Sequence, residues 1–329
     1  MVLILALAVG VFALIVVANL AEQWAWARWL VQAALLAVDL TLVVAAASLL
    51  VRSATGPLPP IVEGAGPPNA SVLLLALWGS ALGTTLVLWT PFRRLLARFL
   101  AVRADSPLHT TALALAVWAV GWVVWQWGAI GGTAGLGRGD LRVSSADLLL
   151  TAVLTFTAAL LGVGWGTRRS GRAVLERLAL RLPRRRHWRL AASATVLLLG
   201  AQWVMSAFWF AFSPESLEQF GEVSRALFGG FTSLEGALLA SVLPAFSEEI
   251  LFRGALQPRF RLLPTAALFA VVHVQYLFSP ATLLIFVVGI GLGLVRRQGD
   301  TTASILTHFG YNFVNLLLAM LASQAGLGG

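Results

Sequence analysis

The chain has 329 residues, of which 59% are hydrophobic and 11% are charged, and its mean hydropathy is +0.85. Soluble domains carry about a quarter charged residues, so this composition excludes an ordinary soluble domain and indicates a polytopic membrane protein. The formal charge is +9 with arginine as the only basic residue type besides histidine, and the absence of cysteine excludes disulfides, a cysteine nucleophile and thiolate metal sites.

Apolar runs along the chain predict about ten membrane segments, because a helix needs about 20 apolar residues to cross a hydrocarbon core of roughly 30 Å. The chain begins apolar at Val2 without a basic leader, so we expect a first span there and no cleaved signal peptide. The eighth and ninth runs are short and flank Ser279-Pro280, which fits either two tilted spans or a re-entrant pair. The predicted segments are 2–18, 30–51, 70–90, 108–130, 146–166, 190–212, 234–256, 264–278, 281–296 and 303–325.

Arginines gather in four of the loops between these segments, and simple alternation of the spans places all four loops on one side. Nine of the arginines lie between Arg168 and Arg189. The positive-inside rule makes this side cytoplasmic and places both termini outside. We therefore interpret the basic residues as topological, with weak attraction to anionic membrane lipid, and not as a nucleic-acid-binding surface.

These patterns predict an all-α bundle that the arginine-rich loop divides. We expect N-terminal membrane helices over 1–167 with an undetermined role, a cytoplasmic loop over 168–189 and a C-terminal core over 190–329. The charged stretch 213–232 between two apolar segments predicts an amphipathic helix at the membrane interface.

Two adjacent glutamates, Glu248 and Glu249, lie inside the seventh segment. A charged side chain at membrane depth costs roughly 2.5–3.5 kcal/mol on insertion scales, and such residues usually mark functional sites. Residues four apart share a helix face, so we expect Arg253 to hold the Glu249 carboxylate. Glu248 then points about 100° away, toward a cavity.

Three further polar residues lie in later apolar segments, namely His273, His308 and Asn312. With a rise of 1.5 Å per residue, Glu249, His273 and Asn312 lie roughly 12–14 Å below the cytoplasmic surface, and His308 lies roughly 8 Å below it. We therefore expect these side chains to meet in one layer. Spacing by four places His308 and Asn312 on one face, continued by Asn315, and places His273 on the face of Phe269.

The residue types in this layer suit hydrolysis of a carbonyl compound. A carboxylate beside an imidazole activates water, and a second imidazole with an amide stabilises an oxyanion. Glu248, Glu249, His273 and His308 could instead hold zinc with an open position for water. The chain contains neither a His-Glu-x-x-His run nor a nucleophilic serine elbow, and the residues leave both alternatives open.

Taken in order, the motifs Glu248-Glu249-x-x-x-Arg253, Phe269-x-x-x-His273 and His308-x-x-x-Asn312 resemble the CPBP family, which comprises CAAX prenyl endopeptidases, bacteriocin-processing enzymes and bacterial relatives. The resemblance covers about residues 235–325. It implies an intramembrane protease in which Glu248 and His273 activate water and His308 and Asn312 stabilise the oxyanion. Glu249 and Arg253 would support the site.

The resemblance implies a prokaryotic plasma membrane protein with its site toward the cytoplasm. The family has been described as both metal-dependent and glutamate-dependent, so zinc remains an open cofactor. Expected partners are membrane lipid and a peptide or protein substrate, lipidated or not, and no nucleic acid. The alternative is a non-catalytic membrane protein, either a transporter with a buried proton relay or a bacteriocin-immunity factor.

Overall fold

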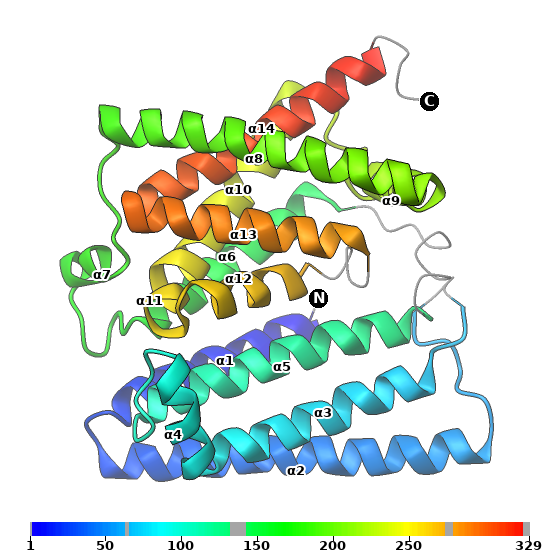
Figure 1. The fold of residues 1–329 in the computed structure, drawn as a ribbon. Helices are drawn as coiled ribbons and strands as arrows, with labels where there is room; N and C mark the ends of the chain where they lie inside the picture. The colour runs from blue at the N-terminus through cyan, green and yellow to red at the C-terminus, as the bar shows by residue number, and fades with distance from the viewer. Residues whose placement is uncertain (1, 63–65, 132–142, 274–278, 325–329) are drawn as a thin grey trace. The chain divides into compact units, whose positions relative to one another are not determined.

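The computed structural model describes residues 2–62, 66–131, 143–273 and 279–324, and every regular element in these ranges is helical (Figure 1). Seven of the described helices are long and apolar enough to cross a membrane, and two shorter apolar helices accompany them. The protein is therefore an integral membrane protein with an all-α fold, as its composition predicted.

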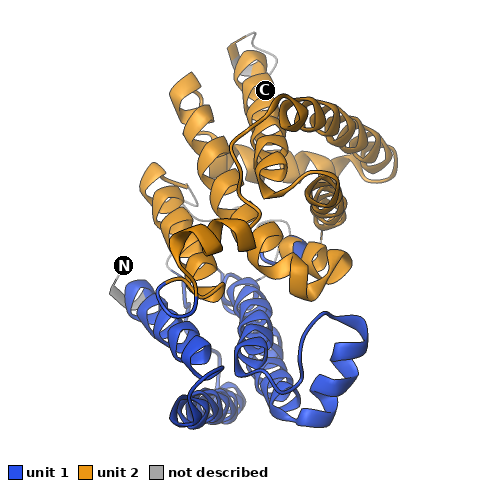
Figure 2. Cartoon of the chain, turned by 90° about the vertical axis from the view of Figure 1, so that its left-hand side faces the viewer, with its two compact units in different colours: residues 1–140, 166–168, 270–278 blue, residues 141–165, 169–269, 279–329 orange. Residues whose placement is uncertain are grey.

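The chain forms two compact units, which Figure 2 distinguishes by colour. Unit 1 comprises residues 1–140, 166–168 and 270–278, and unit 2 comprises residues 141–165, 169–269 and 279–329. Helix α12 (Leu262–Val271) lies in unit 2 except for its last two residues. The helices of unit 1 are α1 (Val2–Leu20), α2 (Ala25–Thr55), α3 (Ala70–Leu88), α4 (Thr90–Phe99) and α5 (Pro107–Ala129). The other helices of unit 2 are α6 (Ser145–Gly162), α7 (Gly171–Arg177), α8 (Arg185–Phe212), α9 (Pro214–Phe228), α10 (Leu234–Glu249), the π-helix η2 (Ile250–Leu256), α11 (Gln257–Phe260), α13 (Pro280–Gln298) and α14 (Thr301–Gln324).

In unit 1, α3 packs against both α2 and α5. Small residues allow the close approach of α3 and α5, since a Cβ atom on Gly121 would lie 1.8 Å from the Ser80 hydroxyl and one on Gly83 would lie 2.7 Å from Val117. Membrane helices associate through such small residues because lipid offers no hydrophobic driving force between them.

The turn between α1 and α2 carries a half-buried carboxylate, Glu22. It accepts hydrogen bonds from the Ser106 hydroxyl and the Leu108 amide at the start of α5, and it forms an ion pair with Arg103. Burial raises the pKa of this carboxyl, but the bonds from Ser106 and Leu108 and the charges of Arg103 and Arg168 outweigh it, so the pKa lies below its ordinary value of 4.5. The ionised carboxylate therefore stabilises unit 1.

We expect Glu22→Gln to lower the free energy of unfolding at neutral pH by about 1–2 kcal/mol, the contribution of hydrogen bonds to a charged group. A carboxyl with a lowered folded-state pKa contributes its stability above the unfolded pKa and loses it as the pH falls through the folded pKa. The difference between wild type and Glu22→Gln should therefore shrink below pH 4.5. Denaturation in detergent micelles at several pH values measures the free energy of unfolding of both proteins. If the wild type and Glu22→Gln differed by the same free energy at every pH, this account would be contradicted.

In unit 2, the predicted segment 234–256 is not one α-helix. The α-helix ends at Glu249 and continues as η2, in which each turn holds an extra residue. Helix α14 packs against α10, α8 and α13, and α6 packs against α10 and η2. These contacts bring the end of α10 and the first half of α14 to the centre of the unit.

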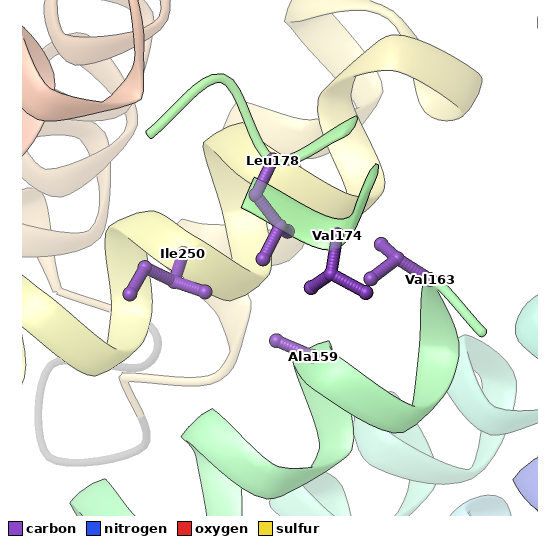
Figure 3. Packing of buried hydrophobic residues seen from close by; sticks show 5 residues of the cluster. All are labelled: Ala159, Val163, Val174, Leu178 and Ile250. Carbon is purple, nitrogen blue, oxygen red and sulfur yellow. The ribbon is translucent and has the colours of Figure 1, made fainter. Parts of the chain in front are cut away.

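The arginine-rich segment 168–189, expected to be a loop, contains helix α7 and two buried apolar side chains. Val174 and Leu178 pack with Ala159, Val163 and Ile250 in a cluster that joins α6, α7 and η2 (Figure 3). The residues at the end of α7 are hydrogen-bonded to the start of α14. Thr301 donates from its amide to the Ala179 carbonyl and from its hydroxyl to the Leu178 carbonyl. The segment is thus part of the folded core of unit 2.

Gly254 in η2 lies directly against Leu178. A Cβ atom at this position would meet the Leu178 side chain at 2.9 Å and its carbonyl oxygen at 3.3 Å. We expect Gly254→Ala to lower the free energy of unfolding by about 1–3 kcal/mol, the usual result of overpacking. Gly200→Ala in α8 is the matched control, since a Cβ atom there meets nothing within 4 Å and should be neutral. Equal effects of the two substitutions would contradict close packing at Gly254.

Stretch 213–232 contains the predicted helix, α9. Two local differences from the predicted spans remain. The segment after the third span contains a short helix, α4, that was not predicted. The eighth predicted segment, 264–278, is helical only to Val271, and its last five residues lie outside the described residues.

Candidate functional site

The centre of unit 2 holds the Glu249 carboxylate, which is fully buried. Its Oε2 accepts from Arg253 Nε at 3.0 Å and lies 2.7 Å from the Ser304 hydroxyl, while its Oε1 lies 3.1 Å from His308 Nδ1. Both carboxylate oxygens are therefore engaged, by one residue of η2 and two residues of α14. The predicted pairing of Glu249 with Arg253 is present in the structure.

Arg253 is itself completely buried and lies over the ring of Phe269, with 4.9 Å between the guanidinium carbon and the ring centroid. A buried ion pair is maintained only when further contacts offset its desolvation. Here the Phe269 ring and the Glu249 carboxylate both offset the desolvation of Arg253. Nη1 and Nη2 of Arg253 meet no hydrogen-bond acceptor among the described residues.

Phe269 also fixes the imidazole of His308. The two rings meet edge to face with centroids 6.0 Å apart, and Phe269 meets Phe252 in the same manner at 5.1 Å. With Nδ1 held by Glu249 and one edge held by Phe269, the orientation of the His308 ring is determined. The hydrogen bond of this ring is made by Nδ1, so Nε2 is the other ring nitrogen.

Glu248 precedes Glu249 on α10 but is half-buried, so the two adjacent carboxylates have different environments. Asn312 is half-buried on α14, one turn after His308. Helical periodicity predicted both features of this arrangement, namely divergent glutamates and a histidine–asparagine pair on one helix.

Asn315, expected to extend the stripe of His308 and Asn312, belongs to a different polar group. It exchanges hydrogen bonds with Gln202 of α8, at 2.8 Å from Gln202 Nε2 to Asn315 Oδ1, and Tyr311 donates its hydroxyl to the same Gln202. This group joins α8 to α14 and holds the helix that carries His308. Sequence reasoning did not single out Gln202 or Tyr311.

Ser304 was also missed, although it could have been found. It precedes His308 by four residues, so both lie on the same face of α14. Its hydroxyl lies between Glu249 Oε2 and the Leu292 carbonyl oxygen, at 2.7 and 2.9 Å, and has one proton to donate to either.

His273 does not lie on the helix of Phe269, as expected from their spacing. Helix α12 ends at Val271, and His273 follows in a turn in which its amide donates to the Ala270 carbonyl. The residue is half-buried and belongs to unit 1. Its role beside Glu248 stays a prediction.

Two of the residues that were predicted to bind zinc, Glu249 and His308, are bonded to each other. In the described residues no group of three or more histidine, aspartate or glutamate side chains is arranged to hold a metal ion. Glu249 directs both oxygens at protein donors, and one of them is bonded to His308. Glu249 therefore does not fit a metal site in this arrangement, and zinc stays a prediction.

Comparison with known proteins shows what this part of the chain is similar to. Residues 230–314 match the family model described as type II CAAX prenyl endopeptidase Rce1-like. The chain is similar to the uncharacterized protein YpbD of Bacillus subtilis, with 32% identity over 125 residues, which are 37% of this chain and 62% of that protein. It thus spans less than two thirds of the length of that relative. No solved structure matches the chain. The family match confirms the resemblance drawn from the three motifs.

Proposed function

We propose that this integral membrane protein, whose residues 230–314 belong to the Rce1-like family of peptidases, is an intramembrane endopeptidase. It hydrolyses a peptide bond near the cytoplasmic leaflet of the membrane, the side given by the positive-inside rule. The observation that carries the proposal is the Glu249 network, in which one glutamate is fully committed to Arg253, Ser304 and His308. Such a network orients reacting groups, and we assign the contact with water to the half-buried neighbour, Glu248.

In this proposal Glu248 is the general base. It takes a proton from water, and the oxygen attacks the carbonyl carbon of the scissile bond. The same proton passes to the leaving nitrogen as the carbon–nitrogen bond breaks. By resemblance, His273 shares the activation of the water.

His308 and Asn312 are proposed to stabilise the oxyanion. A doubly protonated imidazole donates Nδ1–H to Glu249 and keeps Nε2–H for the carbonyl oxygen as it becomes negative. A neutral imidazole that donates through Nδ1 has only a lone pair at Nε2. The oxyanion role therefore requires the imidazolium form, and the Glu249 carboxylate is placed to balance its charge.

Arg253 is proposed to position Glu249 without touching the substrate. It is completely buried, and its contacts are with Glu249 and the face of Phe269. By resemblance to prokaryotic relatives, which often have no prenylated substrate, the proposal does not require a prenyl group on the substrate.

A cleavage assay tests the proposal directly. Purified protein in vesicles is incubated with peptides that are prenylated at a C-terminal cysteine, acylated at the N-terminus or unlipidated, and fragments are identified by mass spectrometry. We expect cleavage at one bond by the wild type and none by His308→Ala. If no peptide is cut and the vesicles instead take up protons in a way that Glu248→Gln abolishes, the protein is a transporter. A bacteriocin immunity that survives Glu248→Gln would indicate a binding protein.

A further inference from the structure

Arginine side chains from two separate elements converge on one turn of η2. Arg177, at the end of α7, donates from Nη1 to the Gly254 carbonyl at 2.8 Å and from Nη2 to the Ala255 carbonyl at 3.2 Å. Arg296, in the last turn of α13, donates from Nε to the Arg253 carbonyl at 3.1 Å. These three carbonyls are consecutive, and the charge of Arg296 acts on Arg177.

Two more arginines belong to the same group. The charges that act on Arg177 are, in decreasing order, those of Arg259, Arg169 and Arg296, and all three are positive. Burial and these like charges together lower the pKa of Arg177 to about 10. We call Arg169, Arg177, Arg259 and Arg296 the arginine cluster.

The protein offers the cluster only partial compensation. Backbone carbonyls of η2 and the Val163 carbonyl, which accepts from Arg169, supply partial negative charge. The charge of Asp300 acts on Arg296, but its carboxylate is hydrogen-bonded to His187 and to the Ala303 amide. Glu176 pairs with Arg172. Within the part of the chain that the structure describes, no carboxylate is hydrogen-bonded to an arginine of the cluster.

Exposed apolar side chains between residues 165 and 182 suggest which environment surrounds the arginine cluster. Trp165, Leu175 and Leu182 are 47%, 51% and 87% exposed, although they lie in an otherwise charged stretch. Tryptophan and leucine with such exposure are favourable where a protein meets the interface of a bilayer. Arg296 stands at the end of α13, a helix long enough to span the membrane, which also indicates the boundary of the lipid.

We propose that the arginine cluster is a binding site for a phosphate-bearing anion, namely the headgroup of an anionic phospholipid from the adjoining leaflet. Guanidinium groups bind phosphate oxygens through paired, charge-assisted hydrogen bonds. Arg259 is exposed and has its donors available, while Arg177 and Arg296 keep part of theirs on η2. The site is separate from the proposed peptidase chemistry and stands or falls independently of it.

Native mass spectrometry of the purified full-length protein tests this site. The protein is extracted from phosphatidylcholine membranes with and without phosphatidylglycerol, and retained lipid and unfolding temperature are measured. We expect the wild type to retain phosphatidylglycerol and to unfold at a higher temperature with it. Arg259→Gln should weaken retention about fivefold, the effect of about one charge near an anionic surface.

Arg297→Gln is the matched control. Like Arg259→Gln, it removes one positive charge, but Arg297 is not among the arginines that act on Arg177, and within the cluster its charge acts on Arg296. It should weaken lipid retention much less than Arg259→Gln does. Both variants should fold, because no side-chain bond of Arg259 or Arg297 supports the described fold.

Inorganic phosphate distinguishes the two sources of the same chemistry. If phosphate in solution raises the unfolding temperature as much as phosphatidylglycerol does, and displaces it, the ligand is free phosphate and the lipid assignment is wrong. If Arg297→Gln weakens retention as much as Arg259→Gln does, the attraction is diffuse and no site exists. Absence of any selectivity for phosphatidylglycerol over phosphatidylcholine overturns the proposal as well.

Discussion

Replacing Glu248 by glutamine should lower the rate of peptide cleavage by about 100-fold or more, the usual contribution of a general base. Glutamine has the same shape but cannot take a proton from water. The unfolding temperature should fall less than it does for Glu249→Gln, because Glu248 is half-buried whereas Glu249 is fully buried. The measurement pairs a fluorescence cleavage assay in vesicles with thermal denaturation of the same preparation.

Glu249→Gln is the informative comparison for this prediction. The two substitutions make the same chemical change at adjacent positions, yet Glu249 is fully buried and bonded to Arg253 and His308. We expect Glu249→Gln to lose both activity and stability. If Glu248→Gln cleaves at the wild-type rate while Glu249→Gln folds normally and is inactive, the roles assigned to the two glutamates must be exchanged.

The second large effect concerns the buried pair itself. Replacing Glu249 by leucine leaves Arg253 without its carboxylate inside the protein and should lower the free energy of unfolding by about 3–5 kcal/mol. Arg253→Met should cost a similar amount, because it leaves the Glu249 charge with His308 and Ser304 alone. Equilibrium denaturation in mixed micelles measures both variants.

The double variant, Glu249→Leu with Arg253→Met, shows whether the pair acts as a unit. Because both charges are removed together, we expect it to be more stable than either single variant. Additive losses would show that each side chain contributes through other contacts, for example Arg253 through its stacking on Phe269.

Much of the C-terminal site followed from spacing alone. Residues four apart on a helix share a face, and this rule placed Arg253 against Glu249 and placed Asn312 one turn after His308. Hydropathy located the helices, because long apolar runs in a chain with so few charges have few other solutions. The same spacing rule would have found Ser304, four residues before His308.

The misses share a physical cause, which is that they depend on contacts between distant segments. Nothing in a window of hydropathy reports that Arg177 bonds a carbonyl 77 residues further along the chain. Helix α7 is short and rich in arginine, so it reads as a loop, although Val174 and Leu178 at a spacing of four were a weak signal. The end of α12 at Val271 was hidden because the apolar residues continue past it.

The π-helix was missed because a pattern with 3.6 residues per turn cannot reveal one surplus residue per turn. Such insertions in helices occur frequently at functional sites. Here η2 starts immediately after Glu249 and contains Arg253, so the irregular winding lies within the pairing of the two charges. The spacing of Glu249 and Arg253 predicted the correct pair, although it assumed an α-helix and Arg253 lies in a π-helix.

This winding leaves room for a change of one residue in the length of the segment. Deleting one residue between Ile250 and Leu256 would allow the backbone to relax to ordinary α-helical pitch. Because the surplus residue is what the wider winding accommodates, the helix downstream would keep nearly its present orientation relative to α10. Relatives that lack the surplus residue should therefore align with this chain through a single-residue gap within η2, with Glu249 and α11 matched on either side.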